Sequence, residues 1–232
     1  MKTHRRLSRG FSLIELMVGL VILAVLLGLG VPAMTGWMVD SRVRSQAEYV
    51  LSGLQLARGE AVKTNALVRF QLVSNMTSTC ALSNNSNLWV VSLTSPVNNC
   101  QKAIGGTVAP VIFYKGERER ATTATTTLGV LAPSLAGLPT GVADPELAVC
   151  FTGTGSLGRY NRADNLCSAS RNPSTTSAGA IQIDITDPTV AAGCISGAVG
   201  SVRCLRIQVS PGGDARLCDP AAIDPNDPRR CT

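Results

Sequence analysis

An uncharged stretch near the N-terminus constrains this chain more than any other feature. The 24 residues from Leu16 to Val39 contain no Asp, Glu, Lys or Arg. About 20 apolar residues in a helix suffice to cross the hydrocarbon core of a bilayer. Because positively charged flanks stay on the cytoplasmic side, a basic N-terminus would leave the bulk of the chain outside. The first ten residues carry four cations and no acid: Lys2, Arg5, Arg6 and Arg9.

One acid, Glu15, lies at the edge of this stretch. A carboxylate at membrane depth costs about 2.5 kcal/mol or more unless it finds a partner. No Lys or Arg occurs between Phe11 and Asp40 to supply one. Glu15 therefore either reaches the head-group region or pairs with a cation from another molecule.

Two general explanations for such an N-terminus are a secretory signal cleaved near Val31-Pro32-Ala33 and an uncleaved membrane anchor. Neither accounts for a Gly-Phe junction ahead of the apolar stretch with an acid four residues later. The stretch Gly10-Phe11-Ser12-Leu13-Ile14-Glu15-Leu16 resembles the class III signal of type IV pilins and type II secretion pseudopilins. The resemblance implies that a prepilin peptidase cleaves between Gly10 and Phe11 and methylates the new N-terminus. It also implies that Glu15 docks to the freed amine of Phe11 on a neighbouring subunit.

The net charge of +6 suggests a nucleic-acid binder only at first sight. Removal of the first ten residues leaves 17 basic against 15 acidic residues. A nearly balanced domain does not bind polyanions strongly by charge alone.

All eight cysteines lie beyond the uncharged stretch, and none forms a C-x-x-C pair. An even count in an exported domain indicates disulfides formed in an oxidising compartment. The only histidine, His4, lies among the first ten residues, so the remainder lacks the imidazole of most zinc sites and of Ser-His or Cys-His catalysis. We expect no metal, no cofactor and no enzymatic activity. Pairing between sequence neighbours predicts four bonds: Cys80–Cys100, Cys150–Cys167, Cys194–Cys204 and Cys218–Cys231.

Apolar residues recur at helical spacing beyond the uncharged stretch, so we expect one long helix from about Phe11 to Lys63. Gly28, Gly30, Pro32 and Gly36 predict a bend or a meltable section in its middle. The later half should lay one apolar stripe on a sheet. The stripe consists of Val39, Val43, Ala47, Val50, Leu54, Ala57 and Ala61.

Short segments rich in β-branched and aromatic residues follow, separated by Gly, Pro, Asn and Ser. They predict an α+β domain in which the N-terminal helix packs on an antiparallel sheet. The low-complexity segments Thr122–Thr127 and Ser168–Ser177 are expected to be exposed loops. The expected strands are Leu67–Val73, Leu88–Thr94, Val111–Lys115, Leu128–Leu131, Leu147–Thr152, Ile181–Thr186 and Cys204–Val209. The expected domains are a leader at 1–10, a transmembrane or filament-core helix at 11–36, an amphipathic helix half at 37–65 and a periplasmic β-rich domain at 66–232.

The helix-then-strands layout is similar to that of GspH/FimT-type minor pilins. This resemblance implies a structural role in an initiating or tip complex that primes pilus assembly. It implies other minor pilins, the major pilin, the prepilin peptidase and the inner membrane as partners, with a single-pass protein later incorporated into a pilus or pseudopilus. A type II secretion pseudopilin is the alternative within the family.

A third hypothesis is DNA capture, because some FimT-type pilins bind DNA through a C-terminal Gly-Arg-x-Arg motif. The corresponding stretch here is Gly213-Asp214-Ala215-Arg216, in which an acid replaces the first Arg. Arg216, Arg229 and Arg230 are the candidate phosphate contacts. Interleaved acids and the absence of an aromatic residue for base stacking from Gly200 onward favour a solvated, disulfide-closed tail instead.

The segment from Gly153 to Gly158 matches G-x-G-x-x-G after an expected strand. A dinucleotide site of this type needs a helix to follow, with its N-terminus at the phosphates. No helical pattern of apolar residues follows here, so we expect a turn or hairpin.

Overall fold

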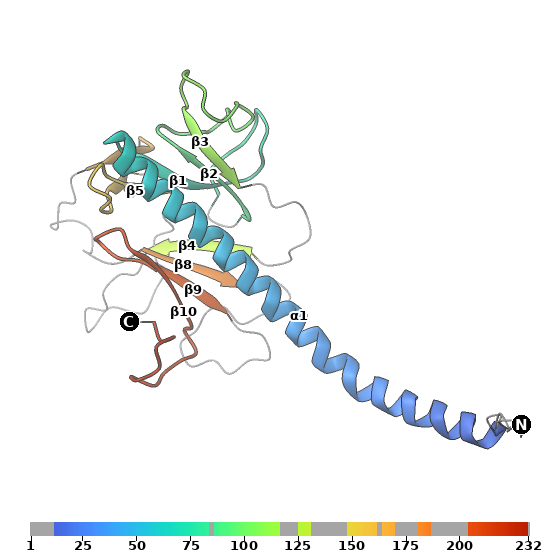
Figure 1. The fold of residues 1–232 in the computed structure, drawn as a ribbon. Coiled ribbons are helices and arrows are strands. Elements are labelled where there is room, and N and C mark those ends of the chain that lie inside the picture. Colours follow the sequence, from blue (N-terminus) through green and yellow to red (C-terminus); the bar gives the residue numbers. More distant parts are fainter. Residues whose placement is uncertain are drawn as a thin grey trace, which may run out of the picture. The chain divides into compact units, whose positions relative to one another are not determined.

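The computed structural model describes residues 12–83, 86–116, 125–130, 148–161, 164–169, 181–186 and 204–231, with backbone only for 29–36 and 125–130. The chain divides into two compact units, Met1–Val39 and Asp40–Thr232. A single helix, α1 (Leu13–Thr64), belongs to both. It is continuous through residues 29–36, where the sequence predicted a bend or a meltable section (Figure 1).

The C-terminal end of α1 is fixed by a hydrogen-bonded cap. Asn65 adopts a left-handed φ of 49° directly after the helix. The amide of Ala66 donates to the carbonyl of Ala61 at 3.2 Å, and that of Asn65 donates to the carbonyl of Val62 at 3.4 Å. This pair of bonds is a Schellman motif, in which Asn is the usual alternative to Gly. The chain therefore leaves the helix in a defined direction just before the first strand.

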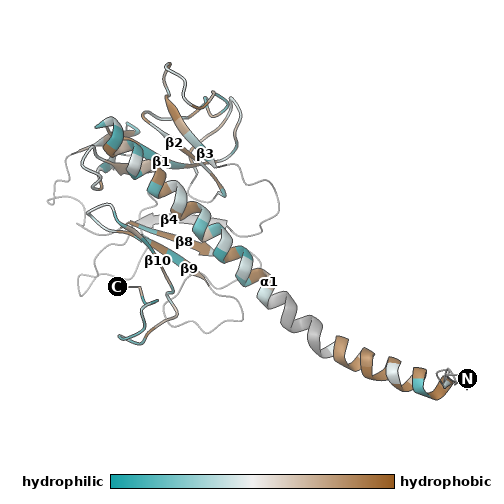
Figure 2. Ribbon diagram, viewed as in Figure 1, coloured by the Kyte–Doolittle hydropathy of each residue, from teal (hydrophilic) through white to brown (hydrophobic). Residues whose placement is uncertain are grey.

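The first unit presents an apolar helix surface. Residues 12–28 are all exposed, and Figure 2 shows this part of α1 as mostly hydrophobic. Among the residues whose side chains the structure describes, which do not include 29–36, no helix combines the length and the apolarity that a membrane crossing requires.

Within the described residues, the second unit contains two four-stranded antiparallel sheets, whose strands Figure 1 labels, and a hairpin. The first sheet has the order β3-β2-β1-β5, the second has the order β10-β9-β8-β4, and β6 pairs with β7. The strands are β1 (Val68–Val73), β2 (Leu88–Ser92), β3 (Ile112–Gly116), β4 (Thr125–Val130), β5 (Val149–Phe151), β6 (Arg159–Asn161), β7 (Leu166–Ser168), β8 (Ile181–Thr186), β9 (Leu205–Val209) and β10 (Ala215–Cys218).

One hydrophobic core joins α1 to both sheets. Six residues of the expected helix stripe, from Val43 to Ala61, are fully buried in it, and strands β1 and β8 contribute Phe70 and Ile183. Burial of each Val, Leu, Ile or Phe side chain contributes about 1.5–3 kcal/mol. The expected α+β fold, with a long helix packed on antiparallel sheet, is therefore confirmed.

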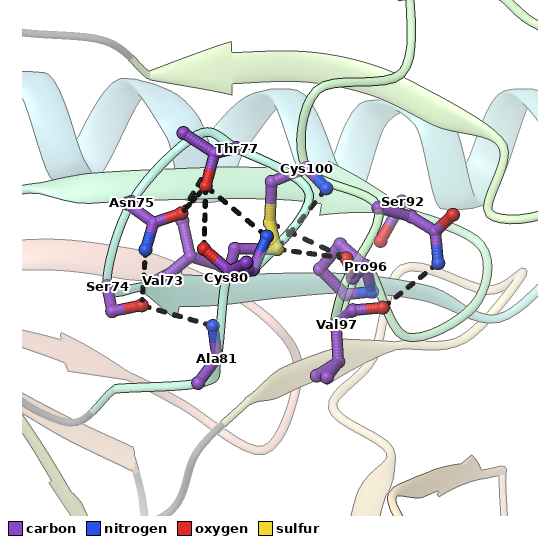
Figure 3. The surroundings of a disulfide bond; sticks show 12 residues. Val73, Ser74, Asn75, Thr77, Cys80, Ala81, Ser92, Pro96, Val97 and Cys100 are labelled. Carbon is purple, nitrogen blue, oxygen red and sulfur yellow. Dashed lines mark hydrogen bonds between the residues drawn. A yellow bond between two sulfur atoms is a disulfide. The ribbon is translucent and has the colours of Figure 1, made fainter.

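A smaller core covers the other face of the first sheet. It contains Val73, Val90 and Ile112 together with the disulfide Cys80–Cys100. The sulfur of Cys80 accepts the amide of Cys100 at 3.2 Å (Figure 3). Residues of this core alternate along β1 and β2 with residues of the main core, so the first sheet is covered on both faces.

Three of the four expected cysteine pairs are present as disulfides: Cys80–Cys100, Cys150–Cys167 and Cys218–Cys231. Cys204 is disulfide-bonded as well. Its expected partner, Cys194, lies outside the described residues.

The strand predictions need three corrections. Thr125–Thr127, expected in a loop, form the start of β4, where they pair with Thr186, Ile185 and Asp184 of β8. Threonine is β-branched and suits a strand, so a partner strand overrides the polar composition. Ser168, the first residue of another expected loop, pairs with Arg159 in the unpredicted hairpin β6–β7. Strand β10 was also missed, and it pairs with β9 through Leu217 and Ile207 among others.

We predict that two glycines of α1 respond oppositely to alanine. At Gly53 a Cβ would lie 2.8 Å from the Phe70 ring and 2.9 Å from the Trp89 ring, whereas at Gly59 nothing lies within 4 Å. Gly53→Ala should lower the free energy of unfolding by about 1–3 kcal/mol through overpacking. Gly59→Ala should raise it by about 0.5–1 kcal/mol through helix propensity. Chemical denaturation of the detergent-solubilised full chain measures both, and equal effects would contradict the packing of Trp89 against α1.

Candidate functional site

The first candidate site lies at the start of α1. Glu15 is exposed in the first helical turn, where the positive end of the helix dipole favours a carboxylate. Within the part of the chain that the structure describes, no cation pairs with it. The expected processing residues, Gly10 and Phe11, lie outside the described residues.

Apolar side chains surround this carboxylate along the helix. Leu13, Ile14 and Val21 are 77, 70 and 65 % exposed. An apolar surface of this extent marks a protein or membrane contact, because soluble monomers rarely expose one. Once that surface is buried, the charge of Glu15 needs a cation from outside the described residues.

The second candidate site consists of the C-terminal arginines. Arg216, on β10, donates to the side-chain oxygen of Gln208 at 3.0 Å. Arg229 donates to both carboxylate oxygens of Asp227, at 3.1 and 2.8 Å. This hydrogen bonding lowers the pKa of Asp227 to about 2 and raises the pKa of Arg229. Both arginines therefore already have acceptors within the domain.

Arg230 and the rest of the tail are held beside β10. The bond Cys218–Cys231 closes the segment, and the amide of Asp219 donates to the carbonyl of Arg229 at 2.6 Å. Asp219 and Arg230 form an isolated β-bridge. The disulfide-closed tail is thus ordered by backbone pairing, and it places acids next to its two arginines.

A contact that the sequence did not reveal ties this region to α1. Arg58 donates through Nη1 to Asp214 at 2.6 Å, through Nη2 to the carbonyl of Gly212 at 3.2 Å and through Nε to that of Gly155 at 3.1 Å. Asp214, the acid that stands where the Gly-Arg-x-Arg motif has its first Arg, is thus paired with a cation of the domain. The ion pair is 38 and 75 % exposed, so its Coulomb energy is small; its main effect is to position two loops.

Two glycines permit this close packing. Gly213 has φ +84° and Gly155 has φ +78°, a conformation that other residues adopt with strain. A Cβ on Gly213 would collide with the carbonyl of Gly155. The amide of Leu157 then donates to the carbonyl of Pro211 at 3.0 Å. The β9–β10 turn is consequently fastened to the loop after β5.

That loop is the segment from Gly153 to Gly158. Leu157 bridges back to Phe151 in antiparallel fashion, and strand β6 follows. The predicted turn is confirmed, and the helix that a dinucleotide site requires does not follow it. Among the described residues, no group of three or more His, Cys, Asp or Glu side chains is placed to hold a metal ion.

Two buried polar groups support the scaffold. Glu60 accepts hydrogen bonds from Tyr114 at 3.0 Å and Lys63 at 3.1 Å. The bond to Glu60 raises the pKa of Tyr114. Arg69, only 3 % exposed, donates to the carbonyl of Asn165 at 2.7 Å, and burial lowers its pKa. These contacts join α1 to β3 and β1 to the β6–β7 hairpin.

Comparison with known proteins identifies both units. The prokaryotic N-terminal methylation motif matches residues 5–31. The family described as Type II transport protein GspH matches residues 46–213. The chain belongs to the GspH family. The methylation motif is the class III signal, and family and motif together make the chain a minor pilin or pseudopilin, a class whose members contact other pilins in a filament.

Two solved structures are similar to this chain. Both are crystal structures of the type IV minor pilin FimU of Pseudomonas aeruginosa, in space groups P21 and P65. The first is 16 % identical with a TM-score of 0.41, covering 78 % of this chain and 91 % of its own. The second is 14 % identical with a TM-score of 0.39, covering 77 and 94 %. No curated protein matches the chain significantly.

We predict that removal of the Arg58 guanidinium loosens the β9–β10 turn. In Arg58→Gln, the amides of Leu157 and Gly213 should exchange with solvent about fivefold faster, as expected for a loss of about 1 kcal/mol of local hydrogen bonding. Arg44→Gln is the matched control, because Arg44 pairs with Glu48 at 3.0 Å on the exposed helix surface. Hydrogen-exchange mass spectrometry measures both variants. Equal protection in the two would show that Arg58 does not hold the turn.

Proposed function

We propose that this chain is a minor type IV pilin that joins the initiating or tip complex from which the major pilin assembles. Its role is structural rather than enzymatic. The observation that carries the proposal is a lone carboxylate, Glu15, on the exposed and otherwise apolar first part of a helix that continues into a GspH-family domain. Such a helix is built to be buried among similar helices, and the acid marks where the next subunit's cation belongs.

Processing of the N-terminus precedes assembly into the filament. A prepilin peptidase would cleave between Gly10 and Phe11, within the stretch that the methylation motif covers, and methylate the new amine. Before assembly, the uncharged run from Leu16 to Val39 would hold the chain in the bacterial inner membrane. The domain beyond it would face the periplasm, where disulfides such as Cys80–Cys100 form and persist.

Docking then exchanges one apolar environment for another. Lipid chains and neighbouring helices cover the leucine- and valine-rich surface about equally well, so apolar burial alone gives little preference for the filament. An ion pair between Glu15 and the Phe11 amine of a neighbour supplies that preference. It also fixes the axial register of the two subunits, because only one offset brings the charges together.

We predict that Glu15→Gln abolishes incorporation without unfolding the outer domain. The amide keeps the shape of the side chain but leaves the neighbour's buried amine unpaired, at a cost of about 3–5 kcal/mol. Glu48→Gln, which removes an exposed acid that pairs with Arg44 at 3.0 Å, is the control. The readout is the amount of each variant in sheared filaments and crosslinked to other pilins, normalised to the membrane pool. Wild-type incorporation of Glu15→Gln would refute the docking role.

A type II secretion pseudopilin is the second candidate, favoured by the description of the matching family as a type II transport protein. The same helix chemistry serves both filaments, so Glu15 does not separate them. Deletion of the chain distinguishes the two: loss of surface pili supports the first assignment, and loss of protein secretion with pili retained supports the second.

The structural role also predicts that DNA binding is weak and independent of the C-terminal arginines. Each phosphate contact contributes about 0.9 to the salt slope of binding, but Arg216 and Arg229 are engaged by Gln208 and Asp227. Gel-shift titration of the full chain with duplex DNA at two salt concentrations tests this, alongside a variant with Arg216, Arg229 and Arg230 changed to Gln. Micromolar binding that the variant loses would make DNA capture the main function.

A further inference from the structure

The two tryptophans of the chain have opposite environments. Trp89 is 3 % exposed and packs with its ring centroid 5.3 Å from that of Tyr49 and 5.5 Å from that of Phe70. Trp37 is 71 % exposed, and the adjacent Met38 is 44 % exposed. An indole is the largest amphipathic side chain, with an apolar body and one N–H donor. Trp37 is exposed on a helix whose surface toward the N-terminus is apolar. Such an indole suits an environment that is apolar on one side and hydrated on the other.

The position of Trp37 along the chain indicates which partner this is. No charged residue occurs between Leu16 and Val39, and Asp40 and Arg42 follow immediately. Trp37 therefore stands where the uncharged run gives way to charged sequence. The two ends of the uncharged run, Leu16 and Val39, belong to the same continuous helix, α1.

The length of the helix agrees with this position. From Leu13 to Trp37 the helix rises about 36 Å at 1.5 Å per residue. The hydrocarbon core of a bilayer is about 30 Å thick. If the helix begins at one boundary of that core, Trp37 lies a few ångströms beyond the other, within the head-group layer.

We propose that Trp37 is an interfacial anchor that inserts its indole into the phospholipid head-group layer at the outer face of the membrane. The inference rests on the membrane-embedded state in the proposed function. Trp is enriched at this level of membranes because its ring is apolar while its N–H reaches water and polar lipid groups. Trp37 thereby sets how deeply the chain sits before assembly, and hence the depth at which Glu15 meets its partner. A neighbouring protein is a less suitable occupant, because the apolar run ends at this level whether or not a neighbour is present.

The experiment uses the full chain reconstituted in phosphatidylcholine–phosphatidylglycerol vesicles whose acyl chains carry bromine either near the glycerol or near mid-chain. Bromine quenches indole fluorescence only at short range. Trp37→Phe retains Trp89 alone, so the difference between wild type and this variant isolates the signal of Trp37. Because Trp37 is exposed, the variant should fold, and unchanged thermal unfolding verifies this.

Shallow bromines should quench the Trp37 signal at least about twofold more than deep bromines, as for an indole at the head-group level. Flotation of the vesicles on a density gradient distinguishes the membrane span from the Trp37 anchor. Chain that floats with its vesicles but shows no quenching of Trp37, or stronger quenching by deep bromines, overturns the anchor and leaves the membrane span in place. Chain that does not float overturns both. Quenching that disappears when other pilins are added, without a change in flotation, supports the anchor and shows that assembly extracts Trp37 from the lipid.

Discussion

The fold of the outer domain depends on one stripe of apolar residues along the second half of α1. Val43, Val50 and Leu54 are fully buried in a core that receives residues from both four-stranded sheets. Alanines on the same stripe and Gly53 let the strands and the Trp89 ring approach the helix closely. Each sheet needs an opposing apolar layer for its inner face, and this helix contributes residues to the core that both sheets share. The Asn65 cap fixes the direction in which the chain leaves α1. The Arg58 contacts fix the β9–β10 turn and the loop after β5 beside the helix.

The first half of the same helix has the opposite property. Its apolar side chains are exposed, and its single acid has no cation among the described residues that could neutralise it on burial. The apolar side chains on the second half of α1 are thus buried within the chain, whereas those on its first half are left for another molecule to cover. In the proposed function this asymmetry makes filament assembly the role of the chain, and the specificity of docking would come from one charge in an apolar surface. The GspH-family match and the methylation motif agree with this division of the chain.

Features with a local cause could be predicted from the sequence, and features with a distant cause could not. Helical spacing located the buried stripe, and β-branched runs located most strands. The three described disulfide pairs span only 20, 17 and 13 residues, so pairing of neighbours was an effective rule. By contrast, Arg58 lies 156 residues from Asp214 and 97 from Gly155, and no periodic pattern connects them. Thr125–Thr127 looked like a polar loop because its strand partner, β8, lies more than 50 residues away.

For the candidate site, Glu15 was found from its isolation in the sequence, whereas the acceptors of Arg216 and Arg229 required the structure. The processing role of Gly10 and Phe11 and the docking role of Glu15 remain predictions.

Both the freed amine of Phe11 and the docking of Glu15 depend on processing at the Gly10-Phe11 junction. The decisive measurement is the intact mass of the protein extracted from membranes of its native host, with tandem sequencing of its N-terminus. We expect a chain that starts at Phe11 and carries one methyl group on its α-amine. A chain that starts at Met1, or one cleaved after Ala33 as by a secretory signal peptidase, would contradict this expectation.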